Sequence, residues 1–350
     1  MHLFDHILEP PSYGWKDQNG QPVCPSRKQI FSEFLKRLNI FRSVKNWMTF
    51  TSWFQLLCLL PFLLLFIFRY FEWPLLIVGF VYSMILMGTH GTIWYHRYCT
   101  HKAYTFKNAF WRVLTQHLVI KTVFEEIYAV SHHVHHAKSD QPGDPYNATC
   151  GFWYCFLADA VHQPINRNLS ESDYQKVAAL LKHSGVRANT YEQYRKWGSV
   201  DHPARVLLSW VLNWSFWGTV FYLIGEYGFD HRGMALVCCI FGSAFVWTIG
   251  VRTFNYEGHG KGKLKHTEGV DFNKDDLSIN QIWPGYVAGE WHNNHHLFPG
   301  SARSGFLPYQ LDLAYCYIYL LHKLGGVTHY HDSRKQFLKQ YYRSRSESQD

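Results

Sequence analysis

Four long apolar stretches constrain the fold of this 350-residue chain more than any other feature. They span residues 48–68, 73–91, 206–224 and 234–253, close to the about 20 residues that a helix needs to cross a bilayer. Four core helices this long and apolar are rare in soluble proteins. A composition of 47% hydrophobic and 17% charged residues points the same way. We therefore expect an all-α integral membrane protein with four transmembrane helices in two hairpins.

The polar regions divide the chain between these hairpins. Both hairpin connectors are short, so the long polar regions lie on one side of the membrane, where we expect a helical cap. The expected divisions are an N-terminal segment with an interfacial helix (1–47), hairpin one (48–91), a polar region (92–205), hairpin two (206–253), a second polar region (254–332) and a polar tail (333–350).

Basic residues before the first span indicate that this side is the cytoplasm, since loops rich in Lys and Arg stay inside. They are Lys16, Arg27, Lys28, Lys36, Arg37, Arg42 and Lys45. The N-terminal sequence MHLFDHILEPPSYGW lacks a basic region followed by an apolar core, so we expect no cleavable signal peptide. The expected location is a bacterial inner membrane, or the endoplasmic reticulum in a eukaryote.

Residues 30–41 have the pattern of an interfacial helix. One stripe is apolar, with Lys36 and Arg37 on the opposite side. The apolar members are Ile30, Phe31, Phe34, Leu35, Leu38 and Phe41.

The eight cysteines show no CxxC pair. Cys58, Cys238, Cys239 and Cys316 lie in apolar stretches. This pattern argues against a disulfide scaffold and against a thiolate metal site.

The chain contains 22 histidines, and three clusters of them indicate a metal site. Box one is HRYCTH, box two is HHVHH and box three is HNNHH. The i, i+3, i+4 spacing in boxes two and three places three imidazoles on one face of a helix. The members are His96 and His101; His132, His133, His135 and His136; and His292, His295 and His296.

The spacing also indicates which histidines can be metal ligands and which cannot. His96 and His101 lie about 140° apart on an ideal α-helix, so they converge only if the helix ends or bends between them. His133 points away from its neighbours and is expected to face solvent or to support a ligand. Twelve histidines outside the boxes are expected not to be ligands, with His162 and His266 the first exceptions to consider.

The type of ligand limits which metals the site can bind. Eight or more neutral imidazoles without a thiolate suit iron, zinc, copper or nickel. Because one ion takes only some of them, this number implies two metals. Soluble di-iron carboxylate bundles typically contain a Glu-x-x-His motif. The chain has no such motif, so it does not resemble these bundles. A dinuclear all-nitrogen site at a membrane surface points to oxygen chemistry.

Longer motifs around the boxes resemble the membrane fatty acid desaturases, the stearoyl/acyl-CoA desaturase-like family, and most closely its bacterial and cyanobacterial acyl-lipid type. The resemblance runs from about Thr92 to Gly326. It rests on YHR at 95–97 with THK at 100–102, HHAKSDQPGDP at 135–145, NYEGHG with Asn255 and His259, and WHNNHHLFPGSARSG at 291–305.

That resemblance implies a di-iron centre that uses O2 as co-substrate, with no catalytic side chains beyond the metal ligands. Asn255 reaches the second iron through water in that family. The implied set is His96, His101, His132, His135, His136, Asn255, His259, His292, His295 and His296. Three positions depart from the family pattern, His133, Trp94 and Glu290, and none of them removes a ligand.

The implied activity is O2-dependent formation of a cis double bond, with Δ9 favoured, in a long-chain acyl lipid or acyl-CoA. The electrons come from a separate ferredoxin or cytochrome b5, for which basic residues offer a docking site, and no nucleic-acid partner is expected. These basic residues are Lys102, Lys107, Arg112 and Lys138. The alternatives are a lipid hydroxylase or another oxidase of the same di-iron superfamily and, from another class, a metal transporter or a histidine-rich heme protein.

Overall fold

The structure is a computed structural model that describes residues 3–139, 141–259 and 282–342. In that part of the chain, four helices are long and apolar enough to cross a membrane: Val44–Arg69, Trp73–Thr100, Pro203–Gly228 and Gly233–Gly258. The prediction of four membrane-length helices is therefore confirmed at the level of length and composition. All four are longer than expected; the second continues into box one, and the fourth continues almost to His259.

Each long helix is built from shorter segments. They are η2 (Val44–Asn46) with α2 (Trp47–Arg69); α3 (Trp73–Phe80), η3 (Val81–Met87), α4 (Gly88–His90) and η4 (Gly91–Thr100); α11 (Pro203–Gly228); and α12 (Gly233–Gly250), η7 (Val251–Thr253) and α13 (Phe254–Gly258). Segments η3 and η4 are π-helical, with wider turns than an α-helix.

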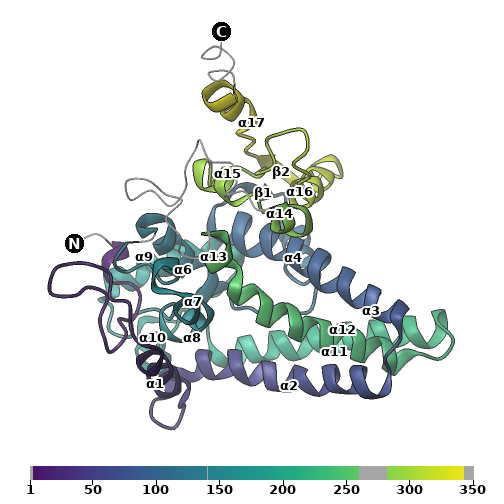
Figure 1. Ribbon diagram of the computed structural model, residues 1–350, viewed down its shortest axis with the longest axis horizontal. Coiled ribbons are helices and arrows are strands. Elements are labelled where there is room, and N and C mark those ends of the chain that lie inside the picture. Colours follow the sequence, from purple (N-terminus) through teal and green to yellow (C-terminus); the bar gives the residue numbers. More distant parts are fainter. Residues whose placement is uncertain (1–2, 140, 260–281, 343–350) are drawn as a thin grey trace.

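Helix α12 is the centre of this bundle, since α2, α3 and α11 all pack against it. Small residues permit the close approach: a Cβ atom added to Gly242 would lie 2.8 Å from the Cα atom of Leu63 on α2. The outer helices carry exposed apolar side chains, such as Leu57, Phe68 and Leu212. Figure 1 shows the four long helices side by side, with most of the other elements gathered at one end of the bundle and the C-terminal elements against the second long helix.

These other elements form the cap. Before box two they are η1 (Leu3–Asp5), α1 (Arg27–Leu38), β1 (Tyr104–Phe106) and α5 (Ala109–Gln116). Box two lies on α6 (Glu125–Lys138), which is followed by η5 (Ala148–Cys150), α7 (Phe152–Phe156), α8 (Ala158–Val161), α9 (Glu171–Leu181), η6 (Lys182–Ser184) and α10 (Tyr191–Trp197). After the fourth long helix come α14 (Ile282–Ala288), α15 (His292–Leu297), α16 (Leu313–Lys323), β2 (Val327–Tyr330), α17 (Arg334–Phe337) and η10 (Leu338–Tyr342).

Two tertiary links hold the cap together. Strands β1 and β2 pair antiparallel, with Tyr104 opposite Tyr330, so the segment after box one meets the C-terminal part of the chain. A disulfide joins Cys24 to Cys150 and ties the N-terminal segment to η5. The sequence argued against a disulfide scaffold because it has no CxxC pair. That argument missed this bond, whose two cysteines are 126 residues apart in sequence.

The buried face of helix α1 differs from the apolar stripe that the sequence predicted. Ser26 caps its N-terminus, as the capping-box pattern allows. The buried face contains Glu33 and Arg37, whose side chains pair at 2.8 Å, whereas Leu35 of the apolar stripe is exposed. Burial of this ion pair is tolerated because Arg37 also donates to the carbonyl oxygen of Pro10, at 2.8 Å.

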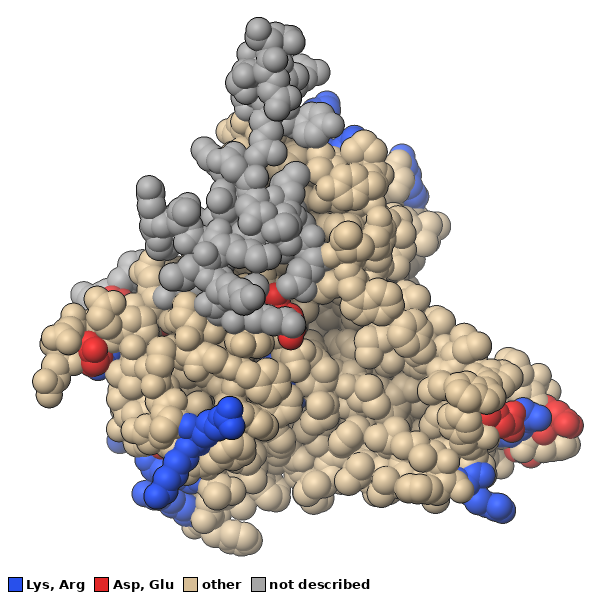
Figure 2. All heavy atoms as spheres, in the orientation of Figure 1, with Lys and Arg blue, Asp and Glu red and all other residues tan. Residues whose placement is uncertain are grey.

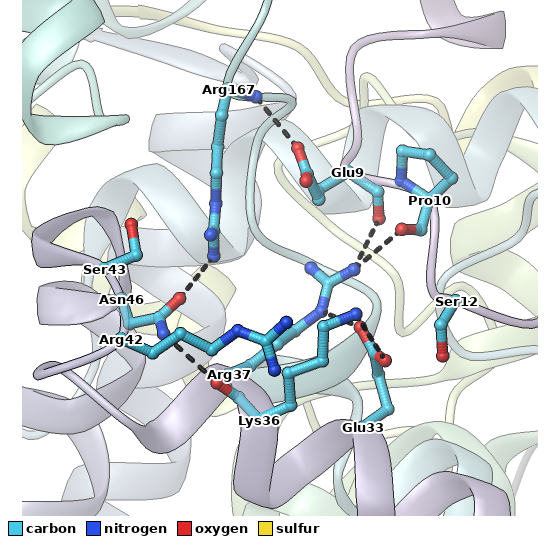
Figure 3. A pocket seen from close by; sticks show the side chains of 10 residues that line it. All are labelled: Glu9, Pro10, Ser12, Glu33, Lys36, Arg37, Arg42, Ser43, Asn46 and Arg167. Atoms are coloured by element: carbon cyan, nitrogen blue, oxygen red, sulfur yellow. Dashed lines mark hydrogen bonds and ion pairs between the residues drawn. The ribbon is translucent and has the colours of Figure 1, made fainter.

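This ion pair borders a polar pocket of about 190 Å³ between α1 and the N-terminal segment. Figure 3 shows the Arg37 guanidinium at its centre, with Arg42 and Arg167 reaching in from either side. Arg167 donates to the Asn46 side-chain oxygen at 2.7 Å, directly before α2 begins. The pocket therefore links the cap to the entrance of the first long helix.

Candidate metal centre

Box one lies on the π-helical segment η4. The N–H group of His101 donates to the carbonyl oxygen of His96 at 3.1 Å, an i→i+5 bond. This wider turn places the two imidazoles on the same face, with ring centroids 5.0 Å apart. The helix ends at Thr100, between the two histidines, as the sequence argument requires, and its wider π-helical register brings His101 round to the face of His96.

Boxes two and three use ordinary helical spacing. Box two lies at the C-terminal end of α6, where the Nε2 atoms of His132 and His136 are 3.1 Å apart. Box three makes up most of α15, where the Nε2 atoms of His292 and His296 are also 3.1 Å apart. His259 directly follows α13, so the fourth long helix delivers it to the same region.

The structure brings the nine predicted histidines into two groups. Within each group the ligand-type nitrogens all lie within 4.8 Å of one another. Group one is His96, His101, His132, His136 and His295, and group two is His135, His259, His292 and His296. Boxes two and three each contribute to both groups, so one box does not correspond to one metal. The role of these side chains as ligands stays a prediction.

The geometry of these groups fits metal ions. An imidazole nitrogen binds a first-row metal at about 2.1 Å, so ligands at right angles lie about 3.0 Å apart. In group one, Nε2 of His295 is 2.9 Å from Nε2 of His96 and 3.1 Å from Nε2 of His136. The Nε2 atoms of His101 and His135, one in each group, are buried without a hydrogen-bond partner. A bound metal would satisfy both nitrogens.

Burial also keeps several of these imidazoles neutral, as metal ligands must be. The loss of solvation on burial, reinforced by neighbouring histidines, lowers the pKa of His101, His132, His295 and His296 well below the ordinary value. At neutral pH these side chains are therefore uncharged.

Two carboxylates orient the imidazoles from behind. Glu290 lies 2.9 Å from Nδ1 of His96, and Asp144 lies 2.9 Å from Nδ1 of His135. An Nδ1–H group that donates to a carboxylate leaves Nε2 as the metal-binding atom and raises its basicity. Sequence reasoning treated Glu290 only as a departure from the family pattern and did not assign Asp144. An acidic residue next to each box was the available signal.

Arg97, the neighbour of His96, was also missed. Its side chain is buried and pairs with Asp312 through both guanidinium ends, at 2.9 and 3.0 Å. It also donates to the carbonyl oxygens of Gly289 and Ala302, each at 2.6 Å. These contacts hold the loops on both sides of box three against box one.

Three other candidate positions among the described residues lie outside the two groups. His133 packs against Phe4, and His162 is buried and hydrogen-bonded to the Tyr13 hydroxyl at 2.5 Å. His266 lies outside the described residues. Asn255 lies one turn before His259, whose N–H group donates to the Asn255 carbonyl oxygen at 3.1 Å. Its contact with a metal-bound water stays a prediction.

Comparisons with known proteins point to the same region of the chain. Residues 71–317 match the family model described as fatty acid desaturase. The chain is 27% identical over 268 residues to the sn-1 stearoyl-lipid 9-desaturase of Anabaena variabilis, which covers 74% of this chain and 84% of that protein. It is 28% identical over 316 residues to the Delta-9 acyl-lipid desaturase 1 of Arabidopsis thaliana, with 86% of each chain covered.

A third relative, a probable chloroplastic lipid desaturase of Arabidopsis thaliana, is 27% identical over 266 residues. That match covers 74% of this chain but 64% of the longer plant protein. The family model extends over more than half of the chain and includes all nine clustered histidines. The chain therefore belongs to the fatty acid desaturase family.

Proposed function

We propose that this protein uses two histidine-bound irons and O2 to introduce a cis double bond, at Δ9, into a long-chain acyl group carried by a membrane lipid. The observation that carries the proposal is the pair of histidine groups at the ends of two membrane-length helices. The names of the Anabaena and Arabidopsis relatives support the Δ9 position and the lipid carrier.

The irons would supply the oxidising power that amino-acid side chains lack, with two electrons from a carrier and two from the acyl chain reducing O2 to water. The nine histidines would hold the metals, with Asn255 completing the site through water. Glu290 and Asp144 keep the Nδ1 protons of His96 and His135 and thereby fix the ring orientations.

The acyl chain would approach group two from the bundle. Phe254 of α13 packs edge-on against His292, and Tyr256 packs against Phe152 of α7. These apolar surfaces would exclude water near the histidines, and α7 would form one wall of the acyl-binding tunnel. Holding one CH2–CH2 pair next to the metals selects the position of the double bond.

The proposed topology has two transmembrane hairpins, at 48–91 and 206–253, with both termini and the metal centre in the cytoplasm. The host membrane would be a bacterial inner membrane or the endoplasmic reticulum. The electron donor would be a separate ferredoxin or cytochrome b5. Hydroxylation of the same acyl chain is the alternative outcome, since a di-iron site and O2 do not fix the product.

Expression in a host without its own desaturase tests the proposal. The cells receive iron, O2 and a compatible donor, and their fatty acid methyl esters are analysed by mass spectrometry beside a His295→Ala control. We expect a new cis-Δ9 monoene that the control lacks. Hydroxylated chains would replace the proposal with the alternative, and unchanged lipids from an iron-loaded protein would contradict it.

The acyl carrier is tested separately with purified protein. Vesicles that contain a saturated phosphatidylglycerol or galactolipid are compared with stearoyl-CoA at equal acyl concentration. A lipid substrate predicts product in the vesicle lipid without release of the acyl chain. Product from stearoyl-CoA alone would assign the CoA thioester instead.

A further inference from the structure

An opening on the surface of the cap leads directly to one of the clustered histidines. It has a volume of about 480 Å³ and is lined by His101, Lys102, Gly300, His331 and Ser333, which we call the His101 mouth. Three parts of the chain meet there: the end of η4, the loop after box three and the end of β2. The N–H group of His331 donates to the carbonyl oxygen of Ala103 at 3.0 Å and holds this junction together.

His101 connects the mouth with group one. The residue is partly exposed, yet its Nε2 atom is buried and has no hydrogen-bond partner. One edge of the imidazole therefore faces the mouth while the metal-binding atom faces the interior. The four histidines of group two are all buried, so this surface approaches group one rather than group two.

The lining of the mouth contains one cationic side chain, that of Lys102, and no carboxylate. Lys102 is exposed and makes no ion pair among the described residues. Its φ angle of 50° is in the left-handed region, which ends η4 and turns the chain toward β1. Lys107, Lys335 and Lys339 are exposed nearby in sequence on the two chain segments that form the rim.

Among the described residues of these segments, acidic side chains do not offset this charge. Asp332 lies next to His331 but pairs with Arg303 at 3.5 Å. Figure 2 shows Lys and Arg atoms, and no Asp or Glu atoms, on the visible flank where β2, α16 and α17 lie. Such a rim attracts an acidic partner and repels a basic one.

Resting on the proposed function, we propose that the His101 mouth is the docking site of a small acidic one-electron carrier, and that electrons enter group one through the His101 ring. In each encounter the reduced carrier would lose one electron, and the metal that the histidines of group one would hold would take up that electron. Two encounters supply the two electrons that the carrier contributes per double bond. Because electron tunnelling weakens steeply with distance, a ligand with one edge at the surface is a favourable entry point.

The first test changes the charge of the rim. Lys102→Glu is compared with wild type and with Lys28→Glu, the same charge change on α1. The probe is a soluble plant-type ferredoxin. Its binding is measured with the iron-loaded and the iron-free protein. The rate at which reduced ferredoxin reduces the iron-loaded protein is measured by stopped flow. We expect Lys102→Glu to weaken binding and slow reduction at least tenfold at low salt, with the difference shrinking as salt screens the charges. Lys28→Glu should stay within twofold of wild type.

The second test blocks the mouth without touching a histidine. A Cβ atom at Gly300 meets no other atom within 4 Å, and its backbone is not left-handed, so Gly300→Trp fits the local structure. We expect slower reduction by ferredoxin but unchanged iron content. Dithionite, a small reductant that does not need to dock, should reduce the Lys102→Glu protein at the wild-type rate.

Two results would overturn the proposal: ferredoxin that reduces Lys102→Glu and Gly300→Trp as fast as wild type, or equal losses in Lys102→Glu and Lys28→Glu. Both readouts are independent of lipid product. An error about the acyl substrate would therefore leave them intact, whereas an error about docking would leave desaturation with dithionite intact.

Discussion

Individual carboxylates determine how the clustered imidazoles face the metal positions. Glu290 and Asp144 are both nearly inaccessible to solvent, and each accepts a hydrogen bond from one histidine. A buried carboxylate is costly unless it is paired, so these two residues are retained for what they do to His96 and His135. Their contribution should appear in metal retention rather than in folding.

Glu290→Gln should lower iron affinity by about 10- to 100-fold, because the amide keeps the shape of the side chain but loses the negative charge. Asp173→Asn, a partly exposed carboxylate on α9 that holds His6, is the control and should bind iron like wild type. Iron per chain after dialysis against a chelator is the measurement. Wild-type iron content in Glu290→Gln would show that this carboxylate does not tune the site.

A second prediction for a single residue concerns His162 and the pH dependence of stability. Burial lowers the pKa of His162 to about 3, whereas an unfolded chain has a histidine pKa of about 6.5. Below about pH 6.5 the His162 side chain is therefore protonated in the unfolded state but not in the folded state. The free energy of unfolding falls as the pH falls. Between pH 7 and pH 5 this single group should cost about 2 kcal/mol.

His162→Phe removes that proton uptake. The variant loses the hydrogen bond to Tyr13 and should be less stable at pH 7. Its free energy of unfolding should nevertheless fall less steeply with acid than that of wild type, measured for both iron-free proteins in one detergent. Parallel pH curves would show that His162 is protonated in the folded state.

The sequence predicted the nine histidines but not their supports. HxxHH spacing is visible because it follows the helical period. The contact of Glu290 with His96 joins residues 194 apart in sequence, and no local period reports such a pair. Likewise, the charges of Glu33 and Arg37 suggested exposure, and only their mutual pairing explains why both are buried.

At the scale of elements, the π-helical turn of η4 is the main departure from what spacing predicted. Hydrophobic pattern places the helix but does not report its hydrogen-bond register. The same is true of helix contacts in the bundle, where Gly242 of α12 meets the backbone of α2. Nothing in an apolar stretch distinguishes a glycine at a contact from one that faces lipid.

Gly242→Ala should therefore destabilise the bundle, since the added methyl group would lie 2.8 Å from a backbone atom that cannot rotate away. We expect a loss of about 1–3 kcal/mol. In Gly218→Ala on α11 the nearest atom is 3.8 Å away, so that variant should match or exceed wild-type stability. Thermal unfolding in one detergent compares the two, and equal midpoints would argue against tight α2–α12 packing.

At the scale of the whole molecule, most of the cap lies at one end of the four long helices, α14 packs along the second of them, and the connector between α11 and α12 lies at the other end (Figure 1). Cys316 on α16 and Asp230 in that connector are both exposed, so they report on the two ends. In a membrane these ends would face opposite compartments.

Labelling with a membrane-impermeant maleimide tests this topology. Cys316 should react only from the cytoplasmic face, and Asp230→Cys in a Cys316→Ser background only from the opposite face. Inverted and right-side-out vesicles supply the two directions of access. Reaction of both positions from the same face would rule out a pair of membrane-crossing hairpins.

The helix that crosses from Trp73 to Thr100 carries His96 near its cap end, and the one from Gly233 to Gly258 leads directly to His259. A span whose apolar length differs from the bilayer thickness adjusts by tilting. Because no flexible joint separates these spans from their histidines, such a tilt reaches both metal positions. The thickness of the surrounding bilayer would thereby affect the positions of the clustered histidines, and acyl chains altered by the enzyme would help to set that thickness.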